Sequence, residues 1–278
     1  MTSTSNQPLS DELIIDISQL EALKAQARVL LVAVCEARVF AANHIPGSVL
    51  IQPAELVSGE KPAVGKLPDA ERLSALFSRI GLTPDTHIVA YDDEGGGWAG
   101  RLIWTLDVLG HDQYSYLDGG LVAWLNAGQP VASGPVTVQP VPYRATINQD
   151  LLRTKKWVLT HLEDPDLQVW DARSPEEYRG ERVNALRNGH IPGARNLDWL
   201  ELMDRDNDLR LLPLDVIRSK LQRHGIDPDK ALITHCQTHH RSGLTYLVGK
   251  ALGLDIQAYD GSWAEWGNDP DTPIETGS

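Results

Sequence analysis

The chain has 278 residues, of which 42% are hydrophobic and 23% charged, a composition typical of a folded globular protein. Acidic residues outnumber basic ones by 38 to 25, and the net charge of -13 argues against nucleic acids and anionic membranes as partners. Two cysteines are too few for a disulfide scaffold, and no apolar run approaches the ~20 residues that span a membrane. The N-terminal residues lack the pattern of a signal peptide, so we expect a cytoplasmic protein with reduced thiols.

Three motifs occur twice, in the same order. HIPGSV at His44 recurs as HIPGAR at His190, HIVAYDD at His87 recurs as ALITHCQ at Ala231, and LDGGLVAW ending at Trp124 recurs as YDGSWAEW ending at Trp266. The three separations, 146, 144 and 142 residues in that order, are each close to half of the chain. The repeat predicts two copies of one fold, at 9–130 and 150–275, joined by a proline-containing linker at 131–149.

Each copy alternates short apolar runs with segments of helical periodicity. In the first copy we predict strands at 28–34 and 87–91 and helices at 68–79 and 98–109, each helix followed by a glycine. In the second copy we predict strands at 167–170 and 231–235 and helices at 213–224 and 242–252. This alternation predicts the α/β class, with two tandem domains that each hold a parallel sheet flanked by helices on both faces.

A candidate nucleophile, Cys236, directly follows the second-copy strand at 231–235. Ligands bind such sheets beyond the carboxyl ends of their strands, and the turn into the next helix aims backbone N–H groups at one point. Arg241 adds a positive charge, and a thiol in such surroundings ionises more easily than a free cysteine. The loop therefore predicts an anion cradle with a reactive thiolate inside it.

The corresponding position of the first copy is Asp92, in an acidic, glycine-rich loop at 92–97 that has no nucleophilic sulfur. We expect this loop to be a solvated turn in a structural copy that leaves catalysis to the second, although it could also present an acidic face to a partner. Cys35 follows an apolar strand without a cationic loop and is expected in the core. His44 and His190 open the HIPG motif in both copies, so we expect them to shape a turn.

These segments together resemble a tandem-domain rhodanese. The resemblance rests on HCQTHHRSG at 235–243, WDARSPEEYRG at 170–180, HIPGA at 190–194 and YDGSWAEW at 259–266. The Cys-Gln-Thr-His-His-Arg loop resembles in particular the rhodaneses of Azotobacter and its pseudomonad relatives. YDDEGGGWAGR at 91–101 resembles the inactive domain of tandem rhodaneses, so the likeness extends over nearly the whole chain.

The resemblance implies a thiosulfate sulfurtransferase that works by a ping-pong reaction. Cys236 would take the outer sulfur of thiosulfate as a persulfide and pass it to cyanide or a thiol, with no cofactor and no metal. Arg241 would stabilise the thiolate, and Arg173 of the DAR motif would be the cation that holds the anionic donor. The remaining expected substrate contacts are Gln237, Thr238, His239, His240 and Trp199.

Other functions stay open at this point. Four residues separate Cys236 from Arg241, one fewer than in the related dual-specificity phosphatases, which disfavours a phosphatase. Two histidines stand where many thiosulfate-using rhodaneses carry basic residues, so the loop charge should depend on pH near neutrality, and a persulfide carrier fed by a cysteine desulfurase is an alternative. The loop is bulkier than that of 3-mercaptopyruvate sulfurtransferases, a further alternative, and a zinc site or a pure scaffold fits less well. Two packed copies make a monomer the expected state.

Overall fold

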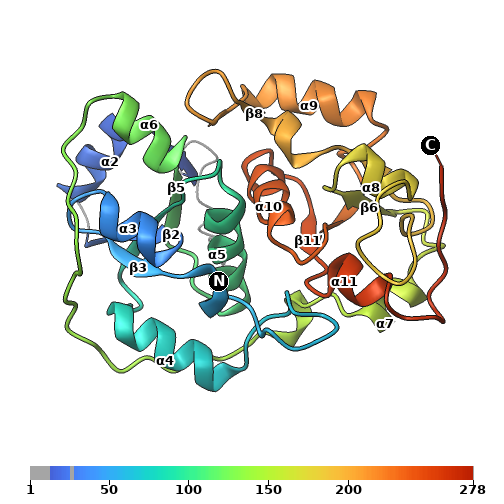
Figure 1. Cartoon of the computed structure of the whole chain (residues 1–278), viewed down its shortest axis with the longest axis horizontal. Helices are drawn as coiled ribbons and strands as arrows, with labels where there is room; N and C mark the ends of the chain where they lie inside the picture. Colours follow the sequence, from blue (N-terminus) through green and yellow to red (C-terminus); the bar gives the residue numbers. More distant parts are fainter. Residues whose placement is uncertain (1–12, 26–27, 278) are drawn as a thin grey trace, which may run out of the picture.

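The computed structural model describes residues 13–25 and 28–277. Within these residues the chain forms two domains that lie side by side, the first drawn in blue to green and the second in yellow to red (Figure 1). Helix α5 (Gly97–Val108) of the first domain and helix α10 (Arg241–Ala251) of the second face each other between them. None of the helices in the described ranges is long and apolar enough to cross a membrane.

The first domain is built on a five-stranded sheet with the order β1-β5-β4-β2-β3, in which all neighbours are parallel. The predicted strands at 28–34 and 87–91 are confirmed as β2 and β4, two of its three inner strands. The strands are β1 (Ile14–Ile15), β2 (Val29–Val34), β3 (Val49–Ile51), β4 (His87–Tyr91) and β5 (Tyr114–Leu117).

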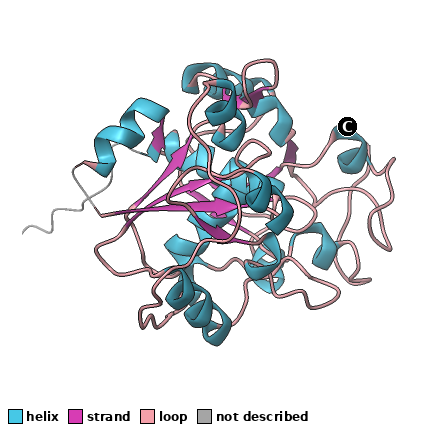
Figure 2. Ribbon diagram, turned by 60° about the vertical axis from the view of Figure 1, so that its left-hand side comes forward, coloured by secondary structure: helices cyan, strands magenta, loops and turns pink. Residues whose placement is uncertain are grey.

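Helices cover both faces of this sheet (Figure 2). Side chains alternate across a strand, so the unbroken apolar run of β2 buries Leu31 and Ala33 on one face and Val32 and Val34 on the other. The helices of the domain are α2 (Ile17–Lys24), α3 (Ala37–Ala42), the 3-10 turn η1 (Pro53–Glu55), α4 (Ala70–Ile80), α5 (Gly97–Val108) and α6 (Gly120–Asn126).

The second domain repeats this plan with a four-stranded parallel sheet of order β11-β10-β6-β7. Its strands are β6 (Leu167–Asp171), β7 (Arg195–Asn196), β10 (Ala231–His235) and β11 (Ile256–Ala258), with a small antiparallel pair β8 (Met203–Asp204) and β9 (Arg210–Leu211) beside them. Its helices are η2 (Gln149–Leu151), α7 (Lys155–Thr160), α8 (Pro175–Arg179), η3 (Trp199–Leu202), α9 (Leu214–Arg223), α10 (Arg241–Ala251) and α11 (Ser262–Trp266). The α/β class and the tandem parallel sheets are therefore as predicted.

The segment between α6 and η2 packs against the first domain instead of hanging free. Ala132 exchanges backbone hydrogen bonds with His44, Val141 donates to the carbonyl of Ser78, and Asn148 donates to that of Val108. In Figure 1 this segment passes down the outer side of the first domain before it reaches α7. The connection between the domains is thus held along most of its length.

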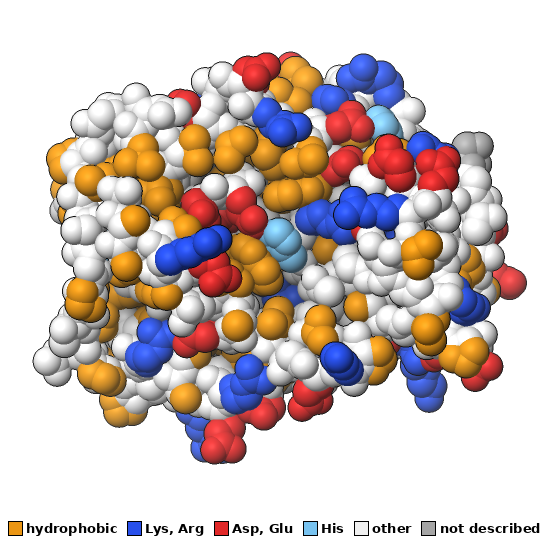
Figure 3. All heavy atoms as spheres, in the orientation of Figure 1, with side chains coloured by type: hydrophobic (Ala, Val, Ile, Leu, Met, Phe, Trp, Pro, Cys, Tyr) orange, Lys and Arg blue, Asp and Glu red, His pale blue; other side chains and the backbone are white. Residues whose placement is uncertain are grey.

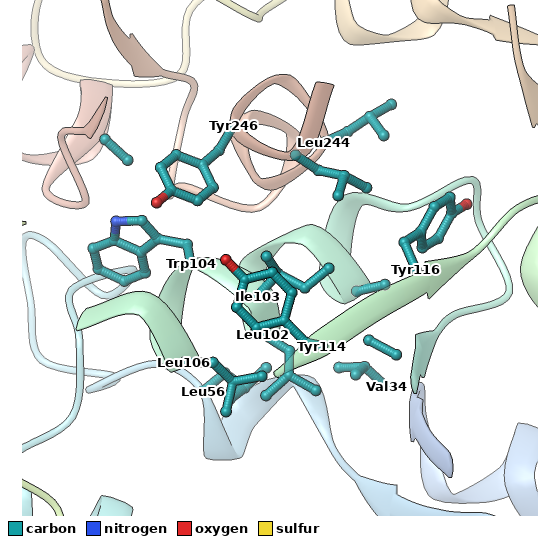
Figure 4. Close-up of a cluster of buried hydrophobic side chains, with 14 of the residues drawn as sticks. Val34, Leu56, Leu102, Ile103, Trp104, Leu106, Tyr114, Tyr116, Leu244 and Tyr246 are labelled. Carbon is teal, nitrogen blue, oxygen red and sulfur yellow. The ribbon is translucent and has the colours of Figure 1, made fainter. Parts of the chain in front are cut away.

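One buried cluster runs through both domains where α5 meets α10. Figure 4 shows Leu244 and Tyr246 of α10 on one side of this cluster and Trp104 of α5 on the other. At its edge the Asp107 carboxylate of α5 accepts hydrogen bonds from the Tyr246 hydroxyl at 2.6 Å and from Lys250 Nζ at 2.7 Å. The two helices thus join the domains through both apolar and charged contacts.

Candidate active site

Cys236 lies at the carboxyl end of β10, an inner strand of the second sheet, and only 1% of its surface is exposed. Its backbone N–H donates to Ser262 Oγ at 3.3 Å, and its carbonyl accepts from the Trp263 N–H at 2.9 Å, so the α11 region fixes it from one side. The loop 236–240 then turns into α10, which begins at Arg241. The strand-loop-helix setting predicted for the nucleophile is confirmed.

The surroundings of Cys236 favour its thiolate. Burial alone would raise the pKa of the thiol, but the charge of Arg241 and hydrogen bonds from the Ser242 side chain and backbone lower it below the ordinary value, with a smaller contribution from His240. A thiolate with a lowered pKa is the reactive form for attack on sulfur. The surroundings of Cys236 therefore favour its nucleophilic form.

Arg241 is held in place by Glu177 of α8. Its two terminal nitrogens contact the two carboxylate oxygens of Glu177 at 2.5 Å and 3.0 Å, a bidentate pair, and Asn184 Nδ2 donates to the same carboxylate at 2.6 Å. Although burial raises the pKa of Glu177, this pairing brings it below its ordinary value. The sequence carries no signal that Glu177 reaches Arg241, which is 64 residues away.

His240 is held by residues of both domains. Its ring stacks on Trp98 of the first domain, with centroids 4.4 Å apart, and meets the edge of Trp199 at 5.5 Å. Its Nε2–H donates to the carboxylate of Glu94, which also belongs to the first domain. Figure 3 shows a histidine side chain reaching the surface near the middle of this face, with acidic and basic groups together to its left and basic groups directly to its right. Trp199 thus contacts the loop after Cys236 through the His240 ring, and its expected contact with a substrate stays a prediction.

The loop at the equivalent position of the first domain is a cradle of backbone N–H groups that is filled by a carboxylate. Asp92 is buried, with 1% of its surface exposed, and accepts hydrogen bonds of 2.9–3.1 Å from five backbone N–H groups, those of Glu94, Gly95, Gly96, Trp98 and Ala99. Burial, together with the charge of Glu94, raises the pKa of Asp92 to about 6. The prediction of a solvated turn is therefore wrong for Asp92, because its carboxylate is the internal ligand that organises this loop.

The sequence from 16 to 127 and again from 154 to 269 matches the family model described as a rhodanese-like domain. The chain belongs to the rhodanese family. It is 46% identical over 264 residues to a thiosulfate sulfurtransferase of Azotobacter vinelandii, covering 95% of this chain and 97% of that protein. A thiosulfate sulfurtransferase of Pseudomonas aeruginosa has the same identity and coverage. The sulfur carrier protein TtuD of Thermus thermophilus is 30% identical over 253 residues, 84% of this chain and 86% of that protein.

Solved structures show the same fold at lower identity. The crystal structure of YnjE has a TM-score of 0.86 at 23% identity and covers 96% of this chain and 69% of that one. An anaerobic ergothioneine biosynthesis enzyme from Chlorobium limicola has a TM-score of 0.86 at 22% identity, covering 96% of this chain and 71% of that one. These likenesses show a shared fold, and the two matches to the family model show two rhodanese domains in tandem.

Arg173 of the second rhodanese domain does not lie where a donor-binding cation would. Its guanidinium is 1% exposed, contacts both carboxylate oxygens of Asp171 at 2.6–3.1 Å, donates to the Gly189 carbonyl at 2.8 Å and lies over the Trp263 ring. Burial disfavours the charge of Asp171, yet Arg173 and His235 lower its pKa to about 2. We correct the expectation accordingly: Arg173 neutralises a buried carboxylate at the end of β6, and its charge is not presented to an anion.

His239 also departs from its expected place at the substrate. Its ring is fully buried, shares a hydrogen bond of 2.7 Å with Ser242 Oγ and meets the edge of Trp104. Burial and nearby Arg101 lower its pKa well below the ordinary histidine value, so the ring is neutral. The expectation that both histidines set a pH-dependent loop charge is therefore wrong for His239, whose backbone φ of 54° places it in the left-handed region and whose role is to shape the loop.

The other two loop residues are held mainly from outside α10. Gln237 Nε2 donates to the Asn184 carbonyl at 3.0 Å, and its carbonyl accepts from the Ala264 N–H at 2.9 Å. The Thr238 backbone runs so close to Gly65 of the first domain that a Cβ at Gly65 would lie 2.1 Å from the Thr238 carbonyl oxygen. Gln237 and Thr238 thus form the wall of the cradle, and their contact with a substrate remains a prediction.

The remaining sequence expectations concern structural residues. Cys35 is buried in the core of the first rhodanese domain, and burial, with Asp93 and Asp92 nearby, raises its pKa to about 12. His44 and His190 occupy equivalent places: each ring stacks on an aromatic side chain, and its Nδ1 hydrogen bonds to a backbone carbonyl at 2.7 Å and 2.8 Å, respectively. Among residues 13–25 and 28–277, no three His, Cys, Asp or Glu side chains are grouped as a metal site would require.

Proposed function

We propose that this chain is a thiosulfate sulfurtransferase with Cys236 as its nucleophile. The observation that carries the proposal is the Cys236 thiol at the end of β10, whose pKa is lowered by Arg241 and by Ser242. Support comes from the two thiosulfate sulfurtransferases that are 46% identical over nearly the full chain. The acid in the corresponding position of the first domain, Asp92, leaves the second domain to carry the reaction.

The reaction consists of two displacements that balance in charge. The Cys236 thiolate attacks the outer sulfur of thiosulfate, a sulfur–sulfur bond forms, and the bond to the sulfonate sulfur breaks so that sulfite leaves with its electron pair. Cyanide, or a thiolate, then attacks the outer sulfur of the Cys236 persulfide, and the Cys236 thiolate is regenerated. Arg241 and the N–H groups at the start of α10 stabilise the negative sulfur in both resting forms. The covalent persulfide makes a separate cofactor unnecessary in this scheme.

The test is the intact mass of the purified protein before thiosulfate, after thiosulfate and after subsequent cyanide, with Cys236→Ala as the matched control. We expect the gain of one sulfur atom from thiosulfate, its loss on adding cyanide, and neither change in the variant. A wild-type protein that gains no sulfur from thiosulfate contradicts the proposed donor. A variant that gains sulfur contradicts the assignment of Cys236.

A persulfide carrier is the second candidate, because both basic side chains beside Cys236 are already paired with carboxylates. Arg241 pairs with Glu177 and His240 with Glu94, which weakens the attraction for an anionic donor. The sulfur carrier TtuD is a relative at 30% identity. Under this proposal a cysteine desulfurase loads Cys236 in the cytoplasm, the chain is a monomer, and the protein is isolated from cells with a persulfide already present. The bulky Gln237–His240 loop argues against 3-mercaptopyruvate as the donor.

A further inference from the structure

The first domain reaches the catalytic loop because α5 and α10 approach at glycines. A Cβ at Gly100 of α5 would lie 2.2 Å from the Gly243 carbonyl oxygen of α10, and a Cβ at Gly243 would lie 2.2 Å from the Gly97 carbonyl oxygen. At Gly97 a Cβ would come within 2.7 Å of His240 Nε2. The start of α5 and the loop before it therefore lie directly against the His240 ring.

The contact between Glu94 and His240 is well defined and yet reachable from solvent. Trp98 stacks on the His240 ring at an interplanar angle of 16° and Trp199 meets it at 61°, so the ring orientation is set by two aromatic side chains. The side chains of His240 and Glu94 are 22% and 36% exposed. The imidazole N–H of His240 could bind a small anion from solvent, but the Glu94 carboxylate already accepts that hydrogen bond.

The charged groups near His240 come from four places in the fold. Glu94 lies in the loop before α5, Cys236 at the end of β10, and Arg241 at the start of α10, where it pairs with Glu177 of α8. His239 is neutral, and Trp98 and Trp199 carry no charge. Of the carboxylates in this group, Glu177 is 3% exposed and engaged in a bidentate pair, whereas Glu94 stands at the open side.

We propose that Glu94 of the first domain determines donor specificity at Cys236: it occupies the His240 N–H and repels anions, so that donors of higher negative charge are disfavoured. The inference rests on the proposed sulfur transfer and extends it to the first domain. It makes Glu94 a specificity residue of the second domain's site. The repulsion by Glu94 acts mainly on donor binding, because the interactions of Cys236 with Arg241 and Ser242 do not depend on the charge at position 94.

The experiment compares two donors that carry the same transferable sulfur but differ in charge, the thiosulfate dianion and the methanethiosulfonate monoanion. In Glu94→Gln we expect the KM for thiosulfate to fall about three- to tenfold, the range for one charge at a partly exposed site, with kcat within about twofold. The KM for methanethiosulfonate should fall by a smaller factor. Asp93→Asn removes the neighbouring charge without touching His240 and should leave both KM values unchanged.

Three results would overturn the inference: an unchanged thiosulfate KM in Glu94→Gln, an equal fall for both donors, or an equal fall in Asp93→Asn. Thermal unfolding of each variant shows that the fold is retained, and Glu94→Ala, which also removes the charge, must reproduce the direction of the change. Failure of the proposed function is distinguishable, because it would appear as a wild-type protein that gains no sulfur from either donor.

Discussion

The two cysteines of this chain show how completely local surroundings decide the chemistry of one residue type. Both are buried, and both follow an inner strand of a parallel sheet. Cys35 lies near the carboxylates of Asp92 and Asp93, and its pKa is raised to about 12, whereas Cys236 lies near Arg241 and Ser242, and its pKa is lowered. Burial opposes ionisation in both, so the sign of the nearby charge makes the difference.

The first prediction concerns the titration of these thiols. Because the folded pKa of Cys236 is depressed, its thiolate is present above that pKa and is lost as the pH falls through it. The ultraviolet absorbance of the thiolate, as the difference between wild type and Cys236→Ser, should therefore titrate below the ordinary cysteine pKa of about 8.5. Arg241→Ala should raise the midpoint and slow sulfur loading at neutral pH by on the order of a hundredfold.

Cys35 is the internal control for this titration. Cys35→Ser should leave the difference signal unchanged, because the raised pKa keeps Cys35 protonated throughout the range. A midpoint for Cys236 at or above that of a free thiol would contradict the prediction, as would a midpoint that Arg241→Ala does not move.

At this scale the sequence predicted the setting of the proposed nucleophile but not the partners of the charged residues. Cys236 and Arg241 were predictable because a cysteine after an apolar strand and an arginine at the next helix start define the loop by their spacing. Arg173 was placed wrongly, because the DAR motif does not reveal that its own aspartate, Asp171, pairs with the Arg173 side chain in the interior. Glu94 and Glu177 were missed for the same reason: their partners are 146 and 64 residues away.

At the scale of elements, the crossing of α5 and α10 depends on glycines, because the two backbones are too close for any side chain between them. Gly243 faces the backbone of α5, and a Cβ at this position would lie 2.2 Å from the Gly97 carbonyl oxygen. The backbone of a closely packed helix cannot shift to make room for it. Gly249 lies on the same helix, but its nearest neighbour is the side chain of Ile256. Alanine at either position gains the same helix propensity, so a difference between the two variants reports the packing of α10 against its neighbours.

The second prediction is that Gly243→Ala lowers the free energy of unfolding by about 2–3 kcal/mol, because the methyl group forces the helices apart. Gly249→Ala, in which the methyl group meets the side chain of Ile256 and alanine favours the helix by about 1 kcal/mol, should lower it by less than Gly243→Ala does. Urea unfolding followed by circular dichroism measures both. An effect at Gly243 no larger than the effect at Gly249 would contradict the prediction that the backbone contact between the two helices excludes a methyl group.

Most of the main elements could be predicted because apolar runs and glycines mark them in the sequence. The strand at 231–235 matches β10 at both ends, and the predicted helix at 98–109 differs from α5 by one residue at each end. The short strands β1, β7, β8 and β9 have two residues each and carry no periodic signal. Their existence depends on the neighbour that each one pairs with, which no local pattern reveals.

At the scale of the molecule, the two domains share one buried cluster and therefore a common stability. Trp104 of the first domain and Leu244 of the second belong to that cluster, and Asp107 ties Lys250 across the same interface. The packed segment between α6 and η2 adds backbone hydrogen bonds along the first domain. Separation of the domains would expose this apolar surface, which makes it costly.

The third prediction follows: the two rhodanese domains unfold together. In a urea series, exposure of Cys35 to a thiol reagent reports the first domain, and loss of sulfur transfer through Cys236 reports the second. Both should change over the same narrow range of urea and coincide with the loss of circular dichroism. Two separated midpoints would show that each domain is stable without the other.

The carboxylate of Asp92 has a consequence beyond the first domain. Five amide groups surround it in the loop that the sequence repeat places opposite the Cys236 loop, so the molecule contains an internal reference: a loop with a fixed, chemically inert carboxylate. An isotope label on that carboxyl group would report what the loop does to a negative charge when no sulfur chemistry takes place. Changes that appear at Cys236 and not at Asp92 within one sample can then be assigned to the reaction itself.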